Sequence, residues 1–184
     1  METTQSIKII EQMLRESKKS LHRNSFYFIM WAALLIPAGI TESVLFGSAG
    51  SWFGWPAAGI IGGIVSGIYS SKEEKRAGVK TAGDRITSFT WGAFMFCLVL
   101  AIVYSLYNAL SPTPLVLMLA GAATFISGGI SRFQPFVWGG VILEAGAIAC
   151  GFFVEPAMHG IVFSVSIIFG YLIPGIMLRR SENV

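Results

Sequence analysis

Four ionisable side chains of this sequence lie inside or at the edge of long apolar runs, where a charge is costly. Glu144 lies in the middle of such a run, whereas Glu42, Glu155 and His159 lie near the ends of others. A carboxyl group in the position of Glu144 could bind and release a proton or a cation. The other three could together bind a divalent cation, because carboxylates and imidazole are common ligands of such metals. The alternative, which we favour, is that these three are simply hydrated.

Glu144 has no basic partner within reach, because the apolar runs contain no Lys or Arg. Desolvation without a counter-charge favours the neutral acid, so we expect Glu144 to be protonated at rest. Its neighbours on the same helical face are Gly140, Ala147 and Ile148, which leave room on one side. That room suits either a close helix contact, with one hydrogen bond to a backbone carbonyl, or a narrow polar cavity. The sequence leaves both open.

The apolar runs that position these groups are long enough to cross a membrane. Of the 184 residues 54% are hydrophobic and 12% are charged, against roughly 25% charged in soluble domains, which excludes a soluble globular fold. Uncharged stretches of 29, 46 and 23 residues lie between Glu42 and Lys72, between Arg85 and Arg132, and between Glu155 and Arg179. A spanning helix needs about 20 apolar residues, and Pro112 and Pro114 divide the longest stretch in two.

The sequence therefore predicts an all-α integral membrane protein with six transmembrane helices, at residues 26–46, 52–70, 88–108, 114–131, 136–154 and 160–178. The fifth contains Glu144, and we expect it to have the lowest hydropathy of the six. Residues 1–25 are predicted to form a cytoplasmic amphipathic lead-in helix, and residues 179–184 a cytoplasmic tail. We expect the lead-in helix to lie on the anionic inner leaflet; a cap over the bundle or a self-pairing helix are the alternatives.

Lys and Arg set the orientation. With six spans, all 13 of them fall on the side of the two termini, so the positive-inside rule predicts that both termini are cytoplasmic. This topology explains why basic residues outnumber acidic ones, so we expect no nucleic-acid partner. The spans also suggest three parallel helical hairpin repeats, because Trp31, Trp91 and Trp138 each begin an outward helix. The alternative is that all helices entering from one side share aromatic starts and basic ends.

Small residues and prolines mark expected helix contacts. Gly59, Gly63 and Gly67 form a stripe at four-residue spacing, which lets helix backbones approach closely. Whether the stripe packs inside one chain or between chains stays open, and we expect self-association into a homo-oligomer. Pro37 and Pro174 lie within spans and should kink them or free a carbonyl for a partner group.

Seven short segments carry a resemblance: IIE at 9–11, NSFYF at 24–28, GIVSGIY at 63–69, VKT at 79–81, DR at 84–85, FISGG at 125–129, and IPG at 173–175. Together they resemble a family of small six-helix bacterial inner-membrane proteins with no assigned activity. The resemblance covers most of the chain and implies a six-helix fold in the bacterial cytoplasmic membrane. It carries no catalytic or binding residue over to this chain.

The sequence favours transport over catalysis. Phosphate-binding loops, metalloprotease motifs and nucleophile elbows are absent from it. The two histidines, His22 and His159, fall on opposite sides of the predicted topology, so we expect neither a multi-histidine metal or haem site within one chain nor a cofactor. We expect no enzyme, but a small proton- or cation-linked transporter or channel that uses Glu144. The alternative is a non-transporting protein that organises membranes, senses lipids or binds a partner.

Overall fold

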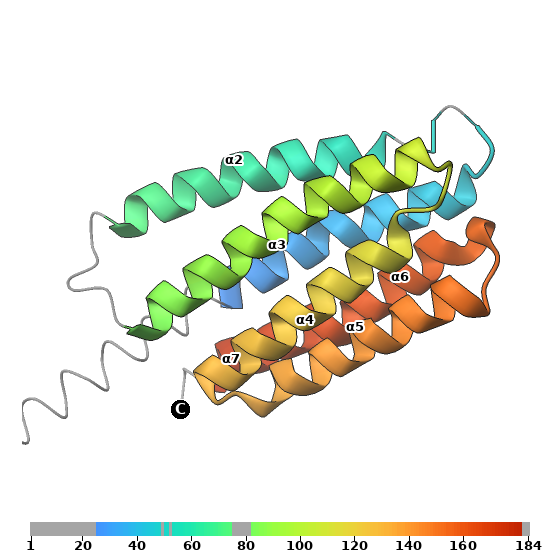
Figure 1. Ribbon diagram of the computed structural model, residues 1–184. Helices are drawn as coiled ribbons and strands as arrows, with labels where there is room; N and C mark the ends of the chain where they lie inside the picture. The colour runs from blue at the N-terminus through green and yellow to red at the C-terminus, as the bar shows by residue number, and fades with distance from the viewer. Residues whose placement is uncertain (1–24, 49, 52, 75–81, 182–184) are drawn as a thin grey trace, which may run out of the picture.

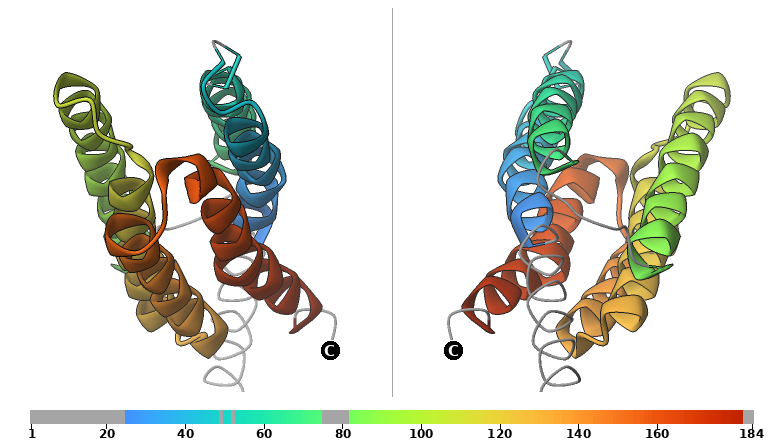
Figure 2. Two further views of the ribbon diagram at one scale, coloured as in Figure 1. Left: turned by 90° about the vertical axis from the view of Figure 1, so that its right-hand side faces the viewer. Right: turned by 90° about the vertical axis from the view of Figure 1, so that its left-hand side faces the viewer.

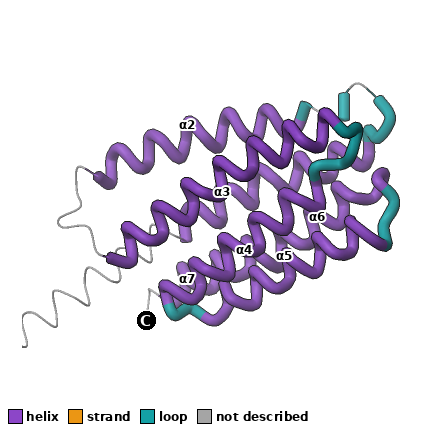
Figure 3. The backbone as a smooth tube through the Cα atoms, in the orientation of Figure 1, coloured by secondary structure: helices purple, strands orange, loops and turns teal. Residues whose placement is uncertain are grey.

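The computed structural model describes residues 25–48, 50–51, 53–74 and 82–181, and the regular structure among them is all helical (Figures 1 and 3). The first helix spans Ser25–Val44. It is followed by α2 (Gly54–Glu74), α3 (Ala82–Tyr107), α4 (Thr113–Ser131) and α5 (Gln134–Phe152). The last helical stretch contains a 3-10 turn (Pro156–Met158), α6 (His159–Ile167), a π-helical turn (Ile168–Leu172) and α7 (Ile173–Ser181). Each of the six predicted spans is thus helical over most of its described residues, and the predicted bounds differ from the observed ones by one or two residues at several ends.

Five of the described helices are long and apolar enough to cross a membrane: the first helix, α3 from Arg85, α4, α5 and the stretch Pro156–Ser181. The exception is α2, which has 21 residues but includes five glycines and a polar end. The expectation that the span with Glu144 has the lowest hydropathy is therefore wrong. Aliphatic side chains of α5 offset a single carboxyl group, whereas glycines contribute almost no hydrophobic surface to α2.

Three finer predictions have different outcomes. The lead-in helix of residues 1–25 lies outside the described residues except for Ser25, and so do residues 182–184 of the tail. Residues 179–181 of the predicted tail instead form the last turn of α7. The hairpin repeat stays a prediction, and the surroundings of its three tryptophans, which differ, give it no support. Trp31 packs on Gly62, Trp91 is half-buried against Phe28, and Trp138 is 66% exposed.

The helices form two arms that diverge from a common base (Figure 2). One arm contains α3, α4 and α5, and the other contains the first helix and α2, with α6 and α7 between them at the base. The pair α4 and α5 has the most extensive contact, whereas α3 packs mainly on α4. Within α3 from Arg85 to Tyr107, Ser105 alone is buried, so this helix exposes apolar side chains almost all round.

The core lies where the arms meet. The ring of Phe28 from the first helix stacks on Phe136 of α5 at 4.1 Å between centroids and meets the edge of Tyr171 at 4.9 Å. Leu117 of α4 and Leu143 of α5 are fully buried beside them. These contacts join three segments that are far apart in the sequence, so aromatic packing holds the two arms together.

Glycines allow the last helical stretch to approach its neighbours closely. The backbones of Gly39 in the first helix and Gly160 in α6 are in contact. On the other side, a Cβ added to Gly139 of α5 would lie 2.5 Å from the carbonyl oxygen of Gly170, in the π-helical turn. Pro174 has no N–H for that oxygen, so the predicted irregularity at Pro174 takes the form of a π-helical turn directly before it. Pro37 lies inside the first helix, which continues to Val44.

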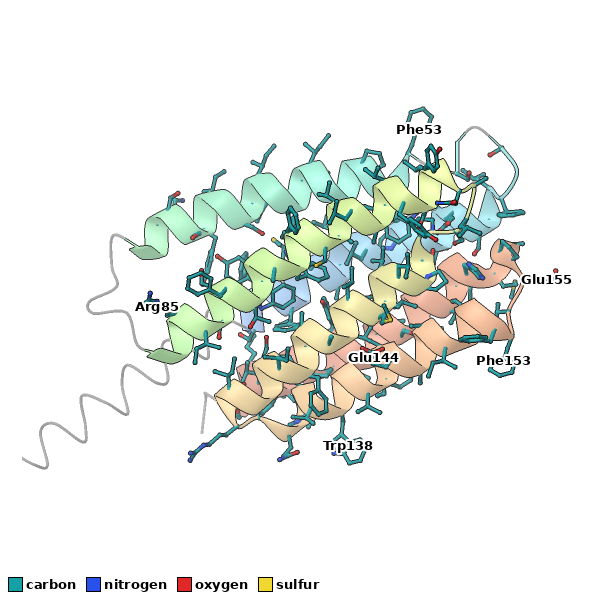
Figure 4. All side chains as sticks on the ribbon, viewed as in Figure 1. Phe53, Arg85, Trp138, Glu144, Phe153 and Glu155 are labelled. Carbon is teal, nitrogen blue, oxygen red and sulfur yellow. The ribbon has the colours of Figure 1, made fainter. Side chains whose placement is uncertain are left out.

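The basic residues whose side chains are described lie at one end of the bundle. The five Lys and Arg whose side chains are described all lie at one end: Lys72, Arg85, Arg132, Arg179 and Arg180. Glu42 and Glu155 lie toward the opposite end, where Figure 4 labels Glu155. The described part of the chain thus has the one-sided basic charge that the sequence predicts, while the side of the membrane that it faces stays a prediction.

Candidate functional site

Glu144 lies near the middle of α5 and contacts α4 (Figure 4). A Cβ added to Gly121 of α4 would lie 2.9 Å from Glu144 Oε1 and 3.0 Å from its Cδ. The glutamate side chain therefore occupies the space that this glycine leaves free. Its carboxyl group also interacts with the backbone of Ala122. The site thus consists of the Glu144 carboxyl group and of Gly121 and Ala122 in α4, which have no side chain or a small one.

A second glycine brings the two helices this close. A Cβ added to Gly140 of α5 would lie 2.8 Å from the carbonyl oxygen of Gly121 and 2.8 Å from the backbone nitrogen of Phe125. The sequence identified Gly140 as a source of room beside Glu144. It did not identify Gly121, because a single sequence does not reveal which helix packs against α5.

Glu144 lies on the outer surface of the bundle and not in its core. It is partly exposed, in a surface strip that we call the α4–α5 seam. The seam consists of Met118, Ala122 and Phe125 of α4 and of Val141, Glu144 and Ile148 of α5. These residues recur every three or four positions and so share one face of each helix. Apart from Glu144 they are all apolar, and in a membrane they face hydrocarbon or another protein.

At the other candidate site, His159 is 4% exposed and makes two hydrogen bonds. Its Nε2 is 3.1 Å from the carbonyl oxygen of Val154, and its Nδ1 is 2.8 Å from Ser111 Oγ. A carbonyl oxygen only accepts, so Nε2 donates, and in the neutral ring Nδ1 accepts the Ser111 hydroxyl proton. His159 thereby joins the α3–α4 connection to the α5–α6 connection. Both ring nitrogens are engaged, so neither is free to bind a metal.

The two carboxylates expected near His159 lie in different environments. Glu42 is partly buried and accepts a hydrogen bond from Trp55 Nε1 at 3.2 Å. It lies close enough to His159 for an electrostatic interaction. Glu155 is exposed at the end of the bundle (Figure 4). Among the described residues no group of three His, Cys, Asp or Glu could hold a metal ion, so the geometry gives a shared cation site no support. The favoured expectation, that all three side chains are simply hydrated, is wrong for His159, because its ring is buried and hydrogen-bonded within the protein.

The predicted glycine stripe faces away from the rest of the described chain. A Cβ added to Gly59, Gly63 or Gly67 would have no atom within 4 Å. Gly62, one position away, instead contacts the Trp31 ring of the first helix. Packing of the stripe within one chain is therefore without support among the described residues, and packing between chains stays a prediction.

One buried polar pair was missed by the sequence analysis. Tyr171, in the π-helical turn, is 4% exposed, and its hydroxyl hydrogen-bonds the side chain of Thr124 in α4. Thr124 Oγ1 donates to the carbonyl oxygen of Ala120 at 2.7 Å, so the tyrosine hydroxyl is the donor in this pair. The sequence signal that could have found this pair is Pro174, because a proline inside a helix disturbs the turn before it and Tyr171 lies in that turn. Such π-helical turns are often found at functional sites.

Comparisons with known proteins give this chain no relative: no family model, no curated protein and no solved structure matches it. The resemblance to small bacterial inner-membrane proteins therefore stays a prediction.

Proposed function

We propose that this chain is a proton- or cation-linked transporter or channel of the membrane, in which Glu144 is the group that binds and releases the ion. It is not an enzyme in this proposal. A bacterial cytoplasmic membrane, both termini on the cytoplasmic side, and contacts of the basic end with anionic lipids belong to the same proposal. The orientation and the lipid contacts are based on the one-sided distribution of Lys and Arg. The bacterial membrane is based on the resemblance to small bacterial inner-membrane proteins.

The position of Glu144 supports this function. Ionisable side chains in the middle of a spanning helix are expensive and commonly mark ion pathways. The described Lys and Arg lie at one end of the bundle, so none of them neutralises Glu144. The carboxyl group is also partly exposed. A proton or ion could reach it without disruption of the aromatic core between the arms.

The proposed chemistry is reversible protonation of one carboxyl group. The neutral acid is the form that tolerates hydrocarbon. Release of the proton leaves a carboxylate, which requires water or a cation beside it. Exchange at Glu144 therefore has to coincide with access of water or of the transported ion to the α4–α5 seam, and this coupling is what a transporter needs.

The experiment is ion flux in reconstituted vesicles driven by a pH gradient. Glu144→Gln keeps the shape and hydrogen-bonding capacity of the side chain but removes its titration, and we expect it to reduce flux at least tenfold. Glu155→Gln removes an exposed carboxylate at the end of the bundle and serves as the matched control, with flux unchanged. Equal flux through the parent protein and Glu144→Gln would show that the proposed function is wrong.

A second function, a non-transporting protein that organises the membrane or binds a partner, is supported by α3 and α2. Both helices expose apolar faces, and the glycine stripe of α2 contacts nothing within the described chain. Such faces are available to lipids or to another membrane protein. This function predicts no ion flux in the parent protein but loss of a complex when Gly63→Leu places a large side chain on α2.

A further inference from the structure

The carboxyl group of Glu144 has an incomplete set of partners among the described residues. On α4 it lies against Gly121 and interacts with the backbone of Ala122. The rest of the seam around it is apolar: Met118, Phe125, Val141 and Ile148. Hydrocarbon offers neither donors nor acceptors. A partly exposed carboxyl group at this depth therefore needs a polar group from outside the described part of the chain.

The chemistry of a carboxylic acid indicates what that group is. A neutral carboxyl has one O–H donor and one carbonyl acceptor, so two of them satisfy each other. A second copy of this chain brings the same group at the same depth if the two copies are related by a two-fold axis along the membrane normal. Residues close to such an axis meet their own counterparts. The described Lys and Arg lie at the end of the bundle and cannot supply this partner.

We infer that the α4–α5 seam docks on the same seam of a second copy of this chain, so that the two Glu144 side chains form one carboxyl pair at mid-membrane depth. Ala122, beside the carboxyl group on α4, is small enough for the two surfaces to approach. The role of the pair in ion exchange rests on the proposed function, but the pairing itself does not.

The pair changes how protons are exchanged. Two carboxylates that share one site cannot both be ionised, because their charges repel at close range. The pair therefore holds one or two protons and exchanges a single proton in each cycle. Ion exchange in this arrangement belongs to the dimer, and one chain contributes half of the site.

Disulfide cross-linking in native membranes tests the docking surface. In a chain with Cys97→Ser and Cys150→Ala, single substitutions Ile148→Cys and Ala122→Cys place a thiol on the seam. Phe96→Cys on α3 and Ile64→Cys on α2 place one on other exposed faces, where the side chains are 68% and 58% exposed. A disulfide needs Cβ atoms roughly 3.5–4.5 Å apart, so mild oxidation should give dimers at the seam positions alone. Dimers at α3 or α2 without dimers at the seam, or none at all, overturn the inference.

The carboxyl pair is tested by the monomer–dimer equilibrium in detergent. Glu144→Leu should weaken dimerisation roughly tenfold, the size of one interhelical polar contact in a membrane. Glu144→Gln should retain it, because two amides also satisfy each other, and Glu155→Leu is the control that should leave it unchanged. An unchanged equilibrium in Glu144→Leu contradicts the pair.

The outcomes separate this inference from the proposed function. Loss of flux in Glu144→Gln without cross-linking at the seam leaves a transport site within one chain and rejects the pair. Cross-linking at the seam with unchanged flux in Glu144→Gln supports the pair and rejects transport by Glu144.

Discussion

Replacement of Gly139 by alanine tests the close contact between α5 and the π-helical turn. The new Cβ would lie 2.5 Å from the Gly170 carbonyl oxygen, whereas ordinary contacts begin at 3.4 Å, so the two backbones would have to separate by about 0.9 Å. Overpacking costs about 1–3 kcal/mol, and alanine regains roughly 0.8–1 kcal/mol of helix propensity. Because the obstacle is backbone and not a flexible side chain, we expect the free energy of unfolding to fall by about 2 kcal/mol.

Reversible unfolding of the purified protein in detergent measures this difference, which corresponds to a change of roughly thirtyfold in the ratio of folded to unfolded protein. Gly63→Ala is the matched control, since its Cβ would have no atom within 4 Å. It should leave stability unchanged or raise it by up to about 1 kcal/mol. If the two variants are equally stable, the reasoning about the Gly139–Gly170 contact is refuted. A loss in Gly63→Ala instead would indicate that the glycine stripe packs inside the chain.

Two further substitutions test buried polar groups. His159→Phe removes both ring nitrogens and leaves Ser111 and the Val154 carbonyl without their partner, so the free energy of unfolding should fall by about 2 kcal/mol; an unchanged value would contradict the role of His159 as a link between two connections. Ser105→Ala removes a fully buried hydroxyl that has no hydrogen-bond partner among the described residues. Its stability should stay unchanged or rise by up to about 1 kcal/mol, and a clear loss would contradict this environment.

Charge spacing alone predicted where helices lie, because a span has to exclude charge over a fixed length. The long uncharged stretch from Arg85 to Arg132 and its prolines divided correctly into α3 and α4. The position of Glu144 near the middle of α5 followed from the same spacing. The spacing did not predict which helix packs against α5, because that contact depends on Gly121, more than twenty residues away on another helix.

The glycines of α2 show the same limit. Four-residue spacing identified Gly59, Gly63 and Gly67 as a stripe, yet the described chain uses Gly62, on a neighbouring face, to receive the Trp31 ring. A single sequence gives the periodicity of small residues but not the side of the helix on which a partner lies. The partners of His159 could not be predicted from the sequence either, because its hydrogen bonds join two connections whose proximity depends on the packing of the whole bundle.

The weak hydropathy of α2 has a consequence for how the chain enters the membrane. A helix with five glycines gains little free energy from transfer into hydrocarbon. The first helix is apolar enough to insert alone, and it contacts α2 through Trp31 on Gly62 and through Ala38 on Gly54. Insertion of α2 should therefore occur as a hairpin with the helix made just before it. A chain that lacked the first helix would therefore leave α2 outside the bilayer as well, and because two spans are lost together, α3 and the later helices would still begin from the sides that they have in the full chain.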